Sequence, residues 1–108
     1  MKNANVFVDV DLTLVDQNGN LLEGAADSLR ILKDKGCHLY LWSTAGTNYA
    51  RSVAERHRLS DLFEGYAPKP DIVIDDMPAS ALNVIVFNPH EEESWASMAN
   101  RIIERHIE

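Results

Sequence analysis

Short apolar runs alternate with segments of helical periodicity along the chain, the order expected of an α/β domain with a parallel sheet. Apolar runs predict strands at residues 6–8, 38–42, 72–74 and 83–88, with a further short strand at 65–67. Helical spacing predicts helices over 24–35 and 47–59, and a last helix that Pro89 opens. Trp95, Met98 and Ile102 follow helical spacing in that last segment, which indicates a core-facing stripe.

Two carboxylates interrupt the first apolar run, N-V-F-V-D-V-D-L-T-L-V at residues 5–15. Asp9 falls at the carboxyl end of the strand predicted at 6–8, whose apolar pattern is typical of a buried parallel strand. In open α/β sheets, sites are built at that end of the strands. An aspartate can also cap a turn, but Asp9 and Asp11 followed by Thr13 favour a functional site.

Polar side chains also follow two later strands. Ser43 and Thr44 stand between the strand at 38–42 and the helix at 47–59. A hydroxyl there, with the free N–H groups of a helix start, can bind a phosphate. Asp75 and Asp76 close the strand at 72–74 in the same way as Asp9 closes the first one.

If the strands at 6–8 and 72–74 are neighbours, four acids converge at one sheet edge: Asp9, Asp11, Asp75 and Asp76. Each pair of like charges about 4 Å apart would cost on the order of 4 kcal/mol at an effective dielectric constant near 20. A cation or protonation must relieve this repulsion. Oxygen ligands favour a hard ion, and a few carboxylates with a substrate phosphate are typical of Mg²⁺. The pattern therefore predicts a magnesium site.

Composition limits the class of protein. A chain of 108 residues has room for one domain, and 45% hydrophobic with 25% charged residues is ordinary for a globular one. The net charge of −7 disfavours binding to nucleic acid or to an anionic membrane. The single cysteine, Cys37, excludes an internal disulfide. Without a signal peptide or a membrane-spanning run, we expect a cytoplasmic protein.

The stretch D-V-D-L-T-L at residues 9–14 resembles the first motif, DxDx[TV], of the haloacid dehalogenase superfamily. Members of this family are mostly phosphatases and phosphotransferases with a Rossmann-like core. Ser43 resembles the second motif, a hydroxyl residue that closes a strand, with Thr44 as the neighbouring alternative. The resemblance implies one capless domain over residues 1–108, with a three-layer α/β core in which helices cover both faces of a mainly parallel sheet.

The resemblance also implies a role for each acid. Asp9 would be the nucleophile that forms an aspartyl phosphate, and Asp11 the general acid and base. The pair Asp75-Asp76 resembles the fourth motif, which binds magnesium. Asp76 would be the direct ligand, together with Asp9. Asp75 would either bind the ion itself or contact one of the residues that bind it.

Lys69, in P-K-P, resembles the third motif, whose lysine steadies the nucleophile and the phosphate. The family usually has a helix between this lysine and the acidic pair, whereas six positions separate Lys69 from Asp75 here. An extended chain covers up to about 3.3 Å per residue, so a straight segment would leave Lys69 at the wrong end of the strand. We expect Lys69 to reach the site only if the segment bends or the strand is very short. Arg51 is the alternative cation.

These residues together predict a magnesium-dependent phosphomonoester hydrolase. One alternative is a non-catalytic phosphate-binding or scaffold protein on the same fold. Another is a receiver-like phosphoacceptor domain, although a receiver has its acidic pair after the first strand and its phosphorylated aspartate after the third. The order of the acids here is different.

Two short segments bear on substrate access. Asn18-Gly19, within 14–22, is a hairpin signal and resembles the family's flap, although an ordinary surface hairpin explains it equally well. Residues 16–24 and 63–69 are each too short to hold a cap domain. We therefore expect an open site that takes either a phosphorylated metabolite, with a homo-oligomer closing the site, or a phosphoprotein.

Overall fold

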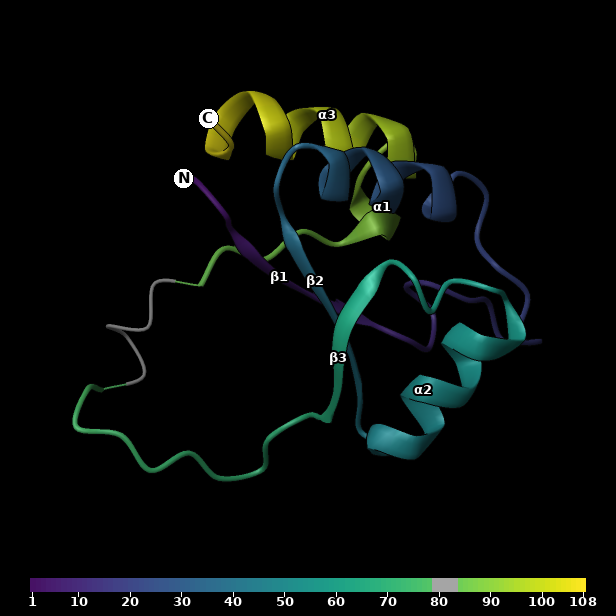
Figure 1. Ribbon diagram of the computed structural model, residues 1–108, viewed down its shortest axis with the longest axis vertical. Helices are drawn as coiled ribbons and strands as arrows, with labels where there is room; N and C mark the ends of the chain where they lie inside the picture. The colour runs from purple at the N-terminus through teal and green to yellow at the C-terminus, as the bar shows by residue number, and fades with distance from the viewer. Residues whose placement is uncertain (79–83) are drawn as a thin grey trace.

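The sheet consists of three parallel strands in the order β1-β2-β3. The computed structural model describes residues 1–78 and 84–108. Its elements follow the chain as β1 (Asn5–Asp9), α1 (Ala25–Asp34), β2 (His38–Ser43), α2 (Thr47–Arg56), β3 (Phe63–Pro68), the 3₁₀ turn η2 (Pro89–Glu91) and α3 (Trp95–His106). The structure confirms an α/β fold with a parallel sheet (Figure 1).

The strand register brings the carboxyl ends of the strands to one edge. Asp9 pairs with Trp42, and Ser43 pairs with Pro68. The chain positions that follow β1, β2 and β3 therefore lie at the same end of the sheet, where sites form in parallel sheets.

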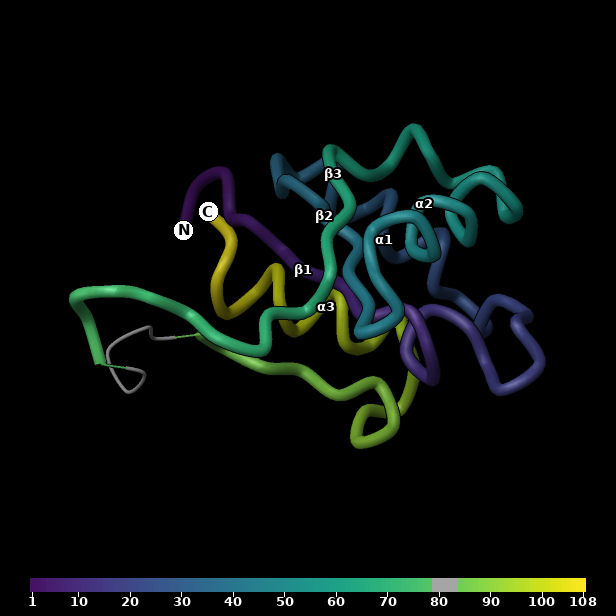
Figure 2. The backbone as a smooth tube through the Cα atoms, turned by 90° about the horizontal axis from the view of Figure 1, so that it is seen from below, coloured from purple at the N-terminus to yellow at the C-terminus, as the bar shows by residue number. Residues whose placement is uncertain are grey.

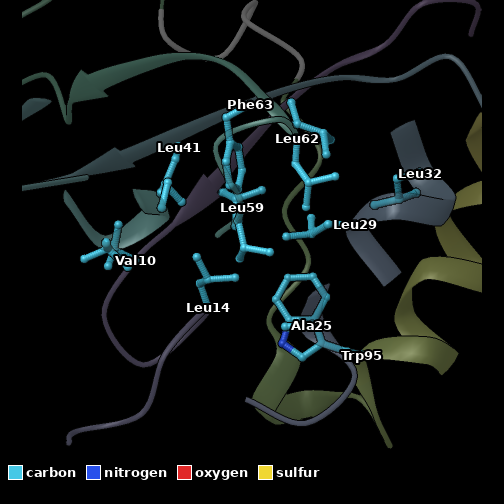
Figure 3. Close-up of a cluster of buried hydrophobic side chains, with 14 of the residues drawn as sticks. Val10, Leu14, Ala25, Leu29, Leu32, Leu41, Leu59, Leu62, Phe63 and Trp95 are labelled. Atoms are coloured by element: carbon cyan, nitrogen blue, oxygen red, sulfur yellow. The ribbon is translucent and has the colours of Figure 1, made fainter. Parts of the chain in front are cut away.

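The helices cover one face of the sheet. Val8 pairs with Leu41 on that face, and both side chains are buried in the core. Arg51 of α2 lies over the ring of Tyr66, the partner of Leu41 on β3, which places α2 on the same face. Leu29 of α1 packs into the same core (Figure 3). α3 packs against α1.

The opposite face of the sheet carries three aromatic residues. Phe7 stacks on Tyr40 with ring centroids 4.9 Å apart, and Trp42 lies 5.0 Å from Phe7. The Phe7 residue is 48% exposed. Within residues 1–78 and 84–108, helices form one layer against the sheet. The third layer expected from the sequence, helices on the second face, is not formed by this part of the chain.

The strand expected at 72–74 does not form, and residues 84–88 of the strand expected at 83–88 are also without regular structure. Asn83 lies outside the described residues. Figures 1 and 2 show the chain after β3 extending away from the sheet. A parallel strand needs a crossover connection of about a dozen residues or more, and only Lys69, Pro70 and Asp71 separate β3 from residue 72.

The boundaries of two other elements differ from expectation. The third strand is not limited to 65–67 but runs over Phe63–Pro68. Pro89 opens the short turn η2, and the last helix starts only at Trp95, where the Ser94 side chain accepts the N–H of Ser97 as an N-cap. No helix in the described part of the chain is long and apolar enough to cross a membrane.

Replacing a core leucine tests this packing. Leu29 is fully buried between α1 and the sheet, so Leu29→Ala should lower the free energy of unfolding by about 2–5 kcal/mol. Ile31→Ala removes the same number of carbon atoms from the same helix but at a side chain that is 43% exposed, and its loss of stability should be clearly smaller. Urea denaturation of both variants measures the difference. Equal losses would contradict the packing of α1 described here.

Candidate functional site

A tight turn after β1 positions the two acids of the first motif. Val10 is fully buried, and its carbonyl accepts the N–H groups of Leu14 and Val15 at 3.0 and 3.1 Å. Leu12 takes a positive φ of 60°, a conformation that costs a non-glycine residue free energy and recurs at functional sites. With Val10 anchored in the core, Asp9 and Asp11 both remain accessible.

Asp9 is held on both carboxylate oxygens. Lys69 Nζ lies 3.1 Å from Oδ1, and the Thr13 hydroxyl donates to Oδ2 at 3.2 Å. The Asp9 and Lys69 side chains are 31% and 34% exposed. An ion pair this exposed contributes little to stability, but it fixes the orientation of the carboxylate and places a positive charge beside it.

Lys69 reaches the site because β3 ends at Pro68. The N–H of Lys69 donates to the carbonyl of Ser43 at 3.1 Å, which extends the β2–β3 pairing by one residue. The lysine thus starts at the carboxyl end of the sheet, and its ammonium lies 6.0 Å from the ring centroid of Trp42. The strand expected at 72–74 does not form, so Lys69 is not held at the opposite end of such a strand from the site.

Asp11 has a different partner. The hydroxyl of Tyr49, in the first turn of α2, donates to Asp11 Oδ1 at 2.6 Å. This hydrogen bond, partial burial and the negative charge of Asp11 raise the pKa of Tyr49 above its ordinary value. Tyr49 therefore stays protonated at neutral pH and holds one carboxylate oxygen of Asp11, a residue that remains exposed.

Ser43 is placed differently from Thr44. The Ser43 side chain is buried, and its Oγ accepts the N–H of Ala45 at 3.0 Å. This bond shapes the β2–α2 loop, and the hydroxyl keeps its own proton to donate. Thr44 is exposed in the same loop. Phosphate binding by Ser43 or Thr44 stays a prediction, and Thr44 is the more accessible of the two.

Asp75 and Asp76 lie in the exposed segment after β3, away from Asp9 and Asp11. The described residues contain no cluster of three or more Asp, Glu, His or Cys side chains able to hold a metal ion. Asp75 Oδ1 accepts the N–H of Met77 at 3.0 Å, and this bond lowers the pKa of Asp75. The structure thus brings together Asp9, Asp11 and Lys69 but not the acidic pair.

A groove of about 930 Å³ runs along β1 to the site. Asp9, Asp11 and Lys69 line its end, and β1 forms one wall. Residues 84–88 form the opposite wall, while the core-facing side chains of α1 and α3 line its floor. The site is accordingly open on the side of the sheet where, among the residues described, no strand pairs with β1.

The segment at 14–22 does form a hairpin beside the site. Asp16 and Asn20 close the turn (Asp16 N to Asn20 O, 2.8 Å), and Gly19 takes a φ of 81°. The loop has three residues with Gly in the left-handed conformation, rather than the two-residue turn that Asn18-Gly19 suggests. His57 bonds to the carbonyl of Gly19 at 2.9 Å, so it ties the hairpin to α2.

Sequence reasoning did not anticipate three of these contacts. Tyr49 lies in the first turn of α2, and nothing in the sequence pairs it with Asp11. Trp42 lies in an apolar strand, and the strand pattern alone does not indicate that its ring lies beside the ammonium of Lys69. His90 bonds to the carbonyl of Leu12 across most of the chain length, and no local pattern signals such a contact.

No protein-family model matches the chain, and comparisons with curated proteins and with solved structures find no match. Motifs and site geometry therefore carry the functional argument alone.

The Tyr49–Asp11 bond makes a testable prediction about pH. Because the folded-state pKa of Tyr49 is raised, the stability from this bond is present below the unfolded value of about 10 and is lost as pH rises through the folded value. A tyrosinate titration of the wild type minus that of Tyr49→Phe should give a midpoint above 10. Asp11→Asn should move this midpoint down. A midpoint at or below 10 in the wild type would contradict the bond.

Proposed function

We propose that this chain hydrolyses phosphomonoesters through an aspartyl phosphate on Asp9. One observation carries the proposal. Lys69 follows the last strand of the sheet in sequence, yet its Nζ lies 3.1 Å from Oδ1 of Asp9 at the carboxyl end of β1. A carboxylate nucleophile and a cation for the phosphoryl oxygens are thus side by side, with Asp11 in the same groove.

In the first step, an oxygen of Asp9 attacks phosphorus, and the bond from phosphorus to the ester oxygen breaks. The proton that the leaving oxygen needs comes from the carboxyl group of Asp11. Thr13 and Lys69 hold the Asp9 carboxylate in one orientation before the attack. The ammonium of Lys69 also offsets the negative charge on the phosphoryl oxygens.

In the second step, water attacks the phosphorus of the aspartyl phosphate and gives its proton to Asp11, which is now ionised. Phosphate leaves, and the Asp9 carboxylate and the Asp11 acid are restored. The hydroxyl of Tyr49 holds Asp11 through both steps by its bond to Oδ1. Uncatalysed phosphomonoester hydrolysis is among the slowest reactions known, so both the covalent step and the proton transfers are needed.

Magnesium, predicted from the sequence, does not enter these steps. As they lie, Asp9 is engaged by Lys69 and Thr13, and Asp11 by Tyr49. The described residues offer no third acid beside them, so an ion here would take its ligands from these two carboxylates, a substrate phosphate and water. The ligand set predicted from the sequence, which includes Asp75 and Asp76, requires those acids to come to the carboxyl end of β1.

A non-catalytic phosphate-binding protein is the second candidate. The separation of Asp75 and Asp76 from Asp9 favours it, because an incomplete set of acids can bind phosphate without turnover. A panel of phosphosugars, nucleotides and phosphopeptides, assayed with Mg²⁺, separates the two functions. Turnover of any member supports the hydrolase, and binding without turnover supports the second candidate.

Substitution of the two acids tests their roles. Asp9→Asn should abolish both turnover and covalent labelling by an activated phosphoryl donor, because no nucleophile remains. Asp11→Asn should still be labelled slowly, while its turnover of ordinary esters falls by about 10²–10⁴-fold. Mass spectrometry after acid quench detects the phosphoenzyme.

Asp61→Asn is the matched control for these two variants. Asp61 is an exposed acid that pairs with Arg30 at 3.1 Å, close to the amino end of β3 and away from the groove. Its turnover and labelling should equal those of the wild type. An undiminished phosphoenzyme in Asp9→Asn would remove Asp9 from the nucleophile role.

Magnesium binding gives a separate prediction. Mg²⁺ should raise the melting temperature of the wild type, because an ion bound to the native acids stabilises the folded state. Asp76→Ala should reduce this rise more than Asp75→Ala, since Asp75 is already engaged by the N–H of Met77. Calorimetry that finds no Mg²⁺ binding at millimolar concentration, with and without inorganic phosphate, would exclude the magnesium site.

A further inference from the structure

In the part of the chain that the structure describes, the outer edge of β1 has no strand beside it. Among the residues described, the sheet order is β1-β2-β3, so the backbone N–H and C=O groups on one side of β1 face the groove. An unpaired strand edge is a template for another strand. Residues 84–86, also exposed, border the other side of the same groove.

The segment after β3 has the composition of the missing strand. Ile72, Val73 and Ile74 are β-branched, and they are 83%, 60% and 98% exposed. Three adjacent β-branched residues in this state are unusual outside an interface. Like β1, this segment ends in acids, Asp75 and Asp76. We call residues 71–77 the arm.

The arm cannot pair in parallel with β1 of its own chain while Lys69 stays on Ser43. With Asp75 beside Asp9, Ile72 would stand beside Val6. Measured along the strands, Val6 lies about five residues nearer the amino end of the sheet than Lys69 does. That separation is about 16 Å, and the path from β3 past β2 and β1 adds about 14 Å sideways. The straight-line distance is about 21 Å. Three residues of extended chain cover at most about 11 Å.

We propose that the arm of a second copy of this chain fills the groove and pairs in parallel with β1, so that two chains exchange arms in a symmetric dimer. The length limit does not apply between chains, because the arm leaves each protomer as an exposed extension (Figure 2). Each protomer has one arm and one groove, so a two-fold axis satisfies both.

The alternation of side chains selects the register. With the partner's Asp75 beside Asp9, the partner's Ile72 and Ile74 lie on the face of Val6 and Val8, above the floor lined by α1 and α3. The partner's Val73 then lies beside Phe7 on the open face. A shift by one residue would turn both isoleucines to the open face.

This exchange also places two acids at the site. The partner's Asp75 and Asp76 would reach Asp9 and Asp11 at the carboxyl end of β1, and the set that one protomer lacks would be complete. The pairing itself does not depend on the proposed function. The catalytic use of the partner's acids rests on it.

Cross-linking tests the pairing between chains. Phe7→Cys and Val73→Cys are made in separate chains that also carry Cys37→Ala, and the two proteins are refolded together and oxidised. Neighbouring strands lie about 4.8 Å apart, within the range that a disulfide spans. We expect a covalent heterodimer on a non-reducing gel. Ile74→Cys, on the opposite face, is the matched control and should not link to Phe7→Cys.

Mass measurement supplies a test without cysteines. Light scattering should find a dimer for the wild type and a monomer for the Ile72→Ser, Ile74→Ser double variant. Both residues are exposed in the protomer, so its circular dichroism should be unchanged. Ile31→Ser, at an exposed position of α1, should remain a dimer. A monomeric wild type, or a disulfide that forms only within a chain carrying both Phe7→Cys and Val73→Cys, would overturn the exchange.

Complementation tests the shared site. Asp9→Asn and Asp76→Asn should each be inactive, but refolding them together in equal amounts should restore about a quarter of wild-type turnover, because half the dimers then hold one intact site of two. No restoration in a cross-linked dimer whose wild type is active would overturn the shared acids. An inactive wild type that still cross-links refutes the proposed function and not the exchange. An active monomer refutes the exchange and not the function.

Discussion

One backbone hydrogen bond, from Lys69 N–H to the Ser43 carbonyl, constrains the carboxyl end of the sheet. It continues the β2–β3 pairing past Pro68, so the Lys69 side chain starts at the level from which it can reach Asp9. The same bond fixes the point where the chain leaves the sheet, on the strand farthest from the outer edge of β1. The position of the cation and the exposure of the arm therefore have a single cause.

The site is coupled to the core through the turn after β1. The indole N–H of Trp95, which is buried on α3, donates to the carbonyl of Thr13 at 3.1 Å, and the hydroxyl of Thr13 donates to Asp9. The last helix thus supports the residue that orients the candidate nucleophile. Since the Asp9–Lys69 pair is itself partly exposed, packing beneath the turn, rather than the ion pair, holds this geometry.

The sequence predicted the elements whose signals are local. The strands that end at Asp9 and Ser43 and the helices α1 and α2 form close to where periodicity placed them. The run at 72–74 was a wrong prediction, because an apolar pattern indicates a tendency to be buried and does not show that the connection can reach a partner strand. The contact between Tyr49 and Asp11 depends on how α2 packs, which no spacing in either segment reports.

An exposed apolar arm and an open site are two unfavourable features that one event would remove. An open site would leave water beside the proposed aspartyl phosphate, and it weakens the electrostatic contacts of Asp9 and Lys69. A strand that enters the groove along β1 would bury the two isoleucines and cover the end of the groove where Asp9 and Asp11 lie. The open site and the exposed arm are then complementary, since the arm of one protomer would cover the site of the other.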